Sequence, residues 1–511
     1  MRRLDGLDCL HLELESERTP MNTSSLTIYD RNAAAGGASF PDILRFVAER
    51  THRAPLLRRR LANAPMNLAR PSWVDDPAFD IEFHVRHIAL PGPGDWHQLC
   101  TQVARLHARP LDRSRPLWEC YVIEAIDRVP GAPRGSFALF FKTHLAALGG
   151  AHASQLFTAM HELAPDARAS LPKGRRRPDR PPTLLDLAGA AAKDAAAAPA
   201  ALARYAVAAA LPAARWGLQE ARTLVGRARA GPLSWSALRA SAPPTRFNDR
   251  VSPHRVVDGV RLPLAVCERI AARVPGAGIE EVALAVIAGG LHAYLDEHGE
   301  APPRSLVAEA PPRPRREARS RPGRLFADSA LLKMGSDVAD PAERLAAIVA
   351  ALERSGAQQA RFGRRLAVDA LGLFPSPAMR VAAPLVARLH SGSRSAPAVN
   401  TSVAIVRAPE APLYFAGAPL VGYYGYAALH DVAGIAHVIG RCGNAVTISV
   451  TACRSMLPDA ERYAAHLAAA FDALAARLRV PHLRRRDVRA GPTAGRGAPP
   501  SAAGTARDRA A

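Results

Sequence analysis

The stretch LDRSRPLWE, at positions 111–119, leads into a strand-like apolar run that covers residues 118–126. A second such run covers residues 137–142, and helical periodicity marks residues 40–61. Short apolar runs are typical of buried β-strands, and a 3.6-residue apolar period is typical of an amphipathic helix. We therefore predict that residues 1–166 form an α/β domain.

A connector should follow this domain. Residues 171–182 are basic and rich in proline, as expected of a solvated linker. The alanine-rich residues 184–229 favour helix, but Lys193, Asp194, Pro199, Arg204 and Pro212 leave no uncharged span of membrane length. Two interpretations stay open for this stretch: a crossover helix packed on the protein, or an amphipathic segment on a bilayer surface. Residues 167–244 are assigned to this connector and its crossover helices.

A second α/β domain is predicted for residues 245–486. Helical patterns cover residues 264–274, 279–297 and 459–478, and strands are expected around Val403 and Val446. Residues 487–511 consist mainly of Gly, Pro, Ala, Ser and Arg without periodicity, which predicts a disordered tail. A chain of 511 residues is long enough for two such domains.

The chain is strongly basic, with a net charge of +21 and a sequence pI near 10.7. Lysine occurs only at Lys142, Lys173, Lys193 and Lys333, so nearly all the positive charge is arginine. Codon usage is one explanation, and attraction to anionic lipid or to CoA phosphates is the other. Arginines gather at 313–324, but no aromatic platform, helix-turn-helix or zinc pattern accompanies them, so nucleic acid is not expected as a partner.

The six cysteines show neither C-x-x-C pairs nor histidine spacing, so we expect no metal site and no disulfide framework. The N-terminus lacks the apolar core and cleavage site of a signal peptide. We therefore expect a cytoplasmic protein, with a peripheral location at the inner face of the membrane or on lipid inclusions as a further candidate.

Several motifs resemble the bacterial wax ester synthase/diacylglycerol acyltransferase family. They are the opening segment with Leu4, Asp8, Glu13 and Met21, the run RPSWVDDPAFD at 70–80, HVRH at 84–87 and, most specifically, LDRSRPLWE with Pro116, Leu117 and Trp118. In the second half, Asn248, ADPAERL at 339–345 and PLY at 412–414 are similar to the family at lower fidelity.

The resemblance implies a two-domain α/β fold of the CoA-dependent acyltransferase type, each domain a sheet layered with helices, with a tunnel at the domain interface. It also implies acyl-CoA as a substrate rather than a cofactor, and diacylglycerol or a long-chain alcohol as acceptor. Partners expected on the same ground are these lipids, a membrane or lipid-droplet surface and a second copy in a homodimer. No further cofactor is expected.

The family's catalytic motif, HHxxxDG, is altered in this chain. The corresponding residues 144–150 read HLAALGG, so the first histidine is His144, the second position is Leu145, the aspartate position is Gly149 and the final glycine is Gly150. The resemblance gives the second histidine the role of general base, which an alcohol needs in order to attack a thioester. Because neighbouring strand residues project to opposite sides, His144 should point away from the site unless the loop is rebuilt.

Two functions follow as alternatives. One is an O-acyltransferase that makes triacylglycerol or wax ester, with His144 as substitute base. The other is a non-catalytic relative that binds acyl-CoA, lipid surfaces or an active paralogue. The whole two-domain length favours the first, and the loss of both motif positions favours the second.

Overall fold

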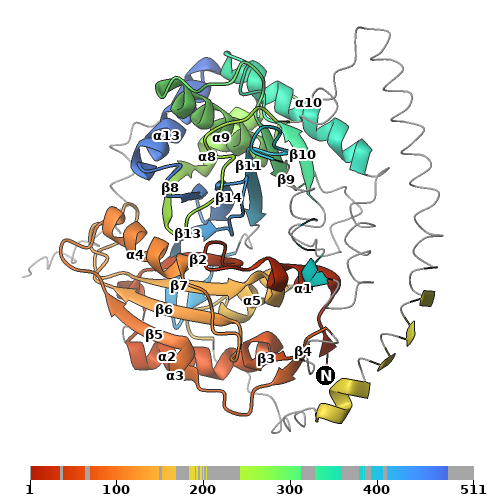
Figure 1. Ribbon diagram of the computed structural model, residues 1–511. Helices are drawn as coiled ribbons and strands as arrows, with labels where there is room; N and C mark the ends of the chain where they lie inside the picture. The colour runs from red at the N-terminus through yellow and green to blue at the C-terminus, as the bar shows by residue number, and fades with distance from the viewer. Residues whose placement is uncertain are drawn as a thin grey trace, which may run out of the picture.

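The computed structural model describes residues 2–34, 38–63, 70–148, 152–167, 183–189, 242–311, 329–359, 393–406 and 411–481, with a few helical positions within 192–203 and 379–385. The expected connector and tail lie mostly or wholly outside these residues, and so do Gly149 and Gly150. Two six-stranded sheets, each covered by helices, form the body of the protein (Figure 1). The α/β fold predicted from the sequence is thereby confirmed.

The first sheet has the strand order β12-β13-β2-β7-β6-β5. All neighbouring pairs are antiparallel except β5 and β6, which are parallel. The strands are β2 (Asn22–Tyr29), β5 (Val85–Ala89), β6 (Trp118–Glu124), β7 (Phe137–His144), β12 (Tyr414–Phe415) and β13 (Ala418–Tyr426). Strands β12 and β13 come from the second half of the chain, so this sheet joins the two halves.

Capping residues mark the starts of two helices in the first half. Ser39 caps α2 (Phe40–Arg50) in a capping box with Asp42, and Asp95 caps α4 (Trp96–Ala108) in the same way. The predicted helix over 40–61 is wrong beyond Arg50: two short 3₁₀ turns and strand β3 (Arg59–Ala62) follow it, and Pro55 opens the second turn because it cannot continue an α-helix. The other elements here are β1 (Arg2–Arg3), α1 (Gly6–Leu14), η1 (Arg31–Ala33), η2 (Thr51–Arg53), η3 (Pro55–Arg58), β4 (Ser72–Asp75), α3 (Ile81–His84), η5 (Leu145–Leu148) and α5 (His152–Met160).

The second sheet has the order β10-β9-β11-β14-β15-β8. Its strands are β8 (Arg255–Pro263), β9 (Val307–Ala310), β10 (Ala330–Lys333), β11 (Thr401–Val406), β14 (Ile435–Cys442) and β15 (Ala445–Cys453). Its helices are α8 (Leu264–Ala271), α9 (Ile279–Glu297), α10 (Pro341–Gln359) and α13 (Ala460–Arg477), and α8, α9 and α13 lie on the side away from the first sheet (Figure 1).

The largest hydrophobic core belongs to the second half, where α9 packs against α13 and α10. Helix α9 is buried on nearly all sides, from Glu281 to Leu291 and again at Tyr294 and Leu295. Its bounds agree with the prediction, whereas α8 ends at Ala271, three residues earlier than predicted. Among the helices that the structure describes, none is long and apolar enough to cross a membrane.

Candidate functional site

The end of strand β7 is fixed from both sides. Strand β7 lies between β2 and β6, and His144 is its last residue. The backbone N–H of His144 donates to the Leu117 carbonyl at 3.1 Å, and the N–H of Leu145 donates to the Met21 carbonyl at 2.8 Å. The segment before Trp118 therefore holds the strand end that carries the altered motif.

The imidazole of His144 is fully buried, at 0% exposure. Its Nδ1 accepts a hydrogen bond from the backbone N–H of Ala146 at 3.0 Å. Because Nδ1 is an acceptor, the ring is in the neutral form that carries its proton on Nε2. Nε2 lies 3.6 Å from Glu15 Oε1, beyond the length of a direct hydrogen bond.

Glu15 follows the last residue of α1 and faces His144. Arg113 donates from Nε to Glu15 Oε2 at 2.6 Å and from Nη2 to the Leu12 carbonyl at 2.6 Å. Burial tends to raise the pKa of Glu15, but its interactions with His144 and Arg113 outweigh this effect and hold the pKa below its usual value. The carboxylate is therefore ionised at neutral pH.

His11, on α1, is a second histidine near His144. Burial of the imidazole lowers the pKa of His11 to about 3. His11 is therefore uncharged at neutral pH, and it adds no positive charge beside His144.

Leu145, which the motif resemblance aligns with the family's base, is the first residue of η5 and is buried. The next residues, Ala146 and Ala147, pack with Leu4, Leu12 and Leu117 in a small apolar cluster beneath α1. A leucine side chain has no lone pair and cannot accept a proton. Gly149 and Gly150 lie outside the described residues, so the aspartate position has no structural account.

The Pro116-Leu117-Trp118 motif anchors the first sheet. All three residues are buried, and Trp118 Nε1 donates to the Leu57 carbonyl at 2.9 Å. The Trp118 ring stacks on His84 at 4.6 Å and on Phe141 at 5.3 Å between ring centroids. The motif reaches His144 through the backbone hydrogen bond to Leu117.

Asn248 lies in a loop network of the second half. Its Nδ2 donates to the carbonyls of Val399 at 2.7 Å and Val432 at 2.8 Å, and its Oδ1 accepts from Asn400 Nδ2 at 2.9 Å. These bonds join three separate loops. The structure therefore gives Asn248 a scaffolding position rather than one beside His144.

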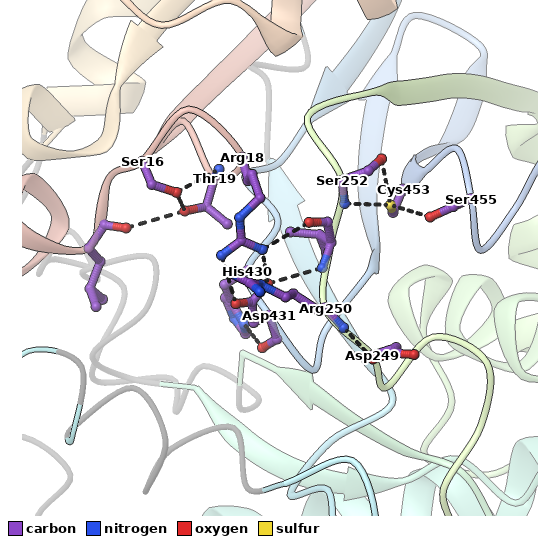
Figure 2. Close-up of polar contacts among 12 residues, drawn as sticks. Ser16, Arg18, Thr19, Asp249, Arg250, Ser252, His430, Asp431, Cys453 and Ser455 are labelled. Atoms are coloured by element: carbon purple, nitrogen blue, oxygen red, sulfur yellow. Dashed lines mark hydrogen bonds and ion pairs between the residues drawn. The ribbon is translucent and has the colours of Figure 1, made fainter.

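The segment that carries Glu15 also contacts the second half (Figure 2). Arg18 pairs with Asp431 at 3.2 Å and donates to the Val251 carbonyl at 3.1 Å. Arg255 donates back to the Arg18 carbonyl. Figure 2 also shows Cys453 Sγ hydrogen-bonded to Ser455 and to Ser252, the residue that follows Val251. The loop between α1 and β2 thus lies against both halves of the molecule.

Sequence reasoning did not single out Glu15, Arg18 or Asp431. Arg113 lay inside the LDRSRPLWE motif without a role. The only available signal was the opening segment of the family, in which Glu15 stands two residues after Glu13. The contact between Glu15 and His144 depends on tertiary structure, because 129 residues separate them and no local pattern links them.

The fold is similar to that of solved acyltransferase structures. The structure aligns with trichothecene 15-O-acetyltransferase from Fusarium sporotrichioides at a TM-score of 0.54 and 11% identity, covering 93% of this chain and 94% of that one. It aligns with a wax ester synthase/diacylglycerol acyltransferase from Marinobacter aquaeolei VT8 at a TM-score of 0.64 and 22% identity, covering 93% of this chain and 99% of that one. At these identities the alignments show the fold alone.

Sequence comparison identifies the family. Residues 4–283 match the wax ester synthase/diacylglycerol acyltransferase catalytic domain, and residues 328–475 match the family's C-terminal domain. A Mycobacterium tuberculosis protein whose name places it among the diacylglycerol O-acyltransferases is 31% identical over 463 residues, covering 90% of this chain and 87% of that protein. The chain belongs to the wax ester synthase/diacylglycerol acyltransferase family, as its motifs predicted.

Proposed function

We propose that this chain is an O-acyltransferase that transfers a fatty acyl group from acyl-CoA to diacylglycerol or a long-chain alcohol. The observation that carries the proposal is the retention of both family domains along the chain, with His144 at the end of β7 beside an ionised Glu15. An acyl transfer of this kind needs a base for the hydroxyl proton, and His144 is the histidine that the motif retains.

In this proposal Glu15 and Arg113 position His144. When the hydroxyl oxygen attacks the thioester carbonyl, the hydroxyl proton passes to Nε2 of His144, and the imidazolium is stabilised by the carboxylate of Glu15, whose Oε1 lies 3.6 Å from Nε2. The C–S bond then breaks, and the proton passes to the CoA thiolate. The step requires the tautomer that carries its proton on Nδ1, so the Ala146 N–H must first leave Nδ1, because a neutral imidazole has only one nitrogen lone pair available to accept a proton.

The test is release of free CoA from a long-chain acyl-CoA in the presence of diacylglycerol or hexadecanol. We expect turnover by the native chain and its loss, about 10²- to 10⁴-fold, in His144→Ala. Turnover that is unchanged in His144→Ala would remove His144 from the mechanism.

A second candidate function is a non-catalytic relative that binds acyl-CoA, a lipid surface or an active paralogue. The observation in its favour is that Leu145 is buried where the base should stand, while the lone pair of His144 is occupied by Ala146. The double change Leu145→His, Gly149→Asp separates the two functions. A silent native chain with an active double variant would favour the binding protein.

A peripheral position at the cytoplasmic face of a membrane or on a lipid inclusion is a further part of the proposal. Leu184 and Leu185 support it, because they are 71% and 84% exposed on a short helix that follows the basic residues 175–177. Exposed leucines that follow a basic run in the sequence suit an anionic lipid surface. Co-sedimentation with anionic vesicles, reduced in Leu184→Ser/Leu185→Ser, is the expected result. A homodimer stays a prediction, which sedimentation velocity tests.

A further inference from the structure

Three buried polar atoms lack a hydrogen-bond partner around the end of β7. Among the residues that the structure describes, these atoms are Glu15 Oε1, Asn22 Oδ1 and His144 Nε2. Asn22 and His144 are both 0% exposed, and the Glu15 side chain is 8% exposed. A buried polar atom without a partner costs free energy, so a group of three indicates a place where a polar ligand can bind.

The three side chains share one location. Asn22 lies directly opposite His144 in the antiparallel ladder between β2 and β7, so the two side chains project from the same face of the sheet. Glu15 Oε1 is 3.6 Å from His144 Nε2. That spacing is too long for a direct hydrogen bond, but it lets one oxygen atom contact both atoms at once.

The neighbouring contacts fix which atoms donate and which accept. Asn22 Nδ2 donates to the Arg109 carbonyl at 2.8 Å, so the free atom of its amide is the acceptor Oδ1. His144 Nδ1 accepts from Ala146, so Nε2 carries a hydrogen and donates. Glu15 Oε1 is an acceptor because the carboxylate is ionised. The set is one donor and two acceptors.

We propose that Glu15, Asn22 and His144 together bind one small oxygen ligand, either a water molecule or the hydroxyl group of an alcohol. Such an oxygen accepts from His144 Nε2 and donates to Glu15 Oε1 or Asn22 Oδ1; water donates to both. Only the alcohol as source rests on the proposed acyltransferase function. A thiol is a weak donor and an ether oxygen cannot donate, so both fit poorly.

The test uses NMR of the full chain with ¹³C,¹⁵N-labelled histidine. The His144 signals are those missing in His144→Gln. The ligands are 1-octanol and octyl methyl ether, which share a chain and an oxygen but differ in the O–H donor. The readout is independent of turnover, so a failed acyltransferase assay leaves this test intact.

A shift of the His144 ring signals with octanol and not with the ether is the expected result for an alcohol hydroxyl. No shift with either ligand, together with a water cross-peak at the Nε2 proton, is the expected result for resident water. Equal shifts with both ligands, or neither a shift nor a water cross-peak, would overturn the proposal.

Variants test the contribution of each acceptor. Asn22→Leu and Glu15→Leu should each weaken the octanol effect or the water cross-peak by roughly 3- to 10-fold, the effect of one lost hydrogen bond. Glu13→Leu is the matched control, because Glu13 pairs with Arg380 rather than with His144. A control variant that behaves like Glu15→Leu would contradict the assignment of Glu15.

Discussion

The pair of residues at 144 and 145 defines the chemistry that this chain can perform. His144 is neutral, fully buried and hydrogen-bonded through its lone pair to Ala146, while Leu145 cannot accept a proton. The nearest charged group that the contacts reveal is Glu15, which Arg113 holds in place. The end of β7 therefore carries a histidine–carboxylate pair, formed by His144 and Glu15.

Glu15 should stabilise the folded state in a pH-dependent way. Its pKa in the folded chain is lowered, so its stabilisation is fully present above the unfolded value of about 4.3 and is lost as the pH falls through the folded value. We expect Glu15→Gln to lower the free energy of unfolding at neutral pH, with the difference from the native chain shrinking below about pH 4. Urea unfolding across this range measures it, and a pH-independent difference would contradict the pKa direction.

Trp118 should be the most costly residue of the motif to remove. It is fully buried, stacks between His84 and Phe141, and donates to the Leu57 carbonyl. We expect Trp118→Ala to lower the free energy of unfolding by about 3–5 kcal/mol. Urea unfolding checks this value, and a loss below about 1 kcal/mol would mean that the motif serves something other than packing.

At the scale of elements, β13 connects the two halves. It pairs with β2 from Leu420 opposite Tyr29 to Tyr426 opposite Ser24, so a strand from the second half completes the sheet of the first. Strand β2 also pairs with β7 through His144. The end of β7 is therefore supported by residues from both halves.

Gly425 of β13 should not tolerate a side chain. A Cβ atom there would lie 2.6 Å from Val438 Cγ1 on β14. We expect Gly425→Ala to destabilise the fold by about 1–3 kcal/mol, the usual cost of overpacking. Gly189→Ala is the control, since nothing lies within 4 Å of its Cβ. Thermal unfolding of both variants tests this, and equal stability of the two would show that β13 and β14 separate readily.

The sequence predicts individual helices better than the pairing of strands that are distant in the chain. Helix α9 is predicted with its observed bounds because its apolar pattern is long. The overextended helix at 40–61 ignored Pro55, a signal that the sequence did contain. The entry of β13 into the first sheet had no local signal, because it depends on contacts between residues about 400 positions apart.

The candidate site was also predictable only in part: the sequence located its motif residues but not its tertiary contacts. The motif resemblance located His144 and Leu145 without any structure. The Glu15–His144–Asn22 group was not predictable, because it forms only when α1, β2 and β7 come together. The polar character of Asn22 alone does not reveal that its Oδ1 is buried without a partner.

For the whole molecule, the packing of α4 against β8 is a second connection between the halves. Trp96 Nε1 donates to Asp258 Oδ1 at 2.7 Å across this contact. Burial raises the pKa of Asp258, although Trp96 and the Gly259 N–H lower it. A carboxylate that is harder to ionise in the folded state weakens the fold as the pH rises.

Asp258→Asn should therefore stabilise the molecule at neutral pH. The amide oxygen still accepts from Trp96, and no buried charge is formed. Because the folded pKa is raised, the native chain has its full stability below the unfolded value of about 3.9 and loses part of it above. We expect the variant's advantage in urea unfolding at pH 7 to vanish near pH 3, and a variant less stable than the native chain at pH 7 would contradict this.

The most direct test of the proposed acyl transfer is ester formation by the purified native chain. Acyl-CoA with a labelled acyl group is incubated with hexadecanol or diacylglycerol, and the labelled ester is separated and measured. We predict ester that depends on both substrates and that falls about 10²- to 10⁴-fold in His144→Ala. No ester from the native chain, with ester from Leu145→His/Gly149→Asp, would contradict it and leave a binding protein on an acyltransferase fold.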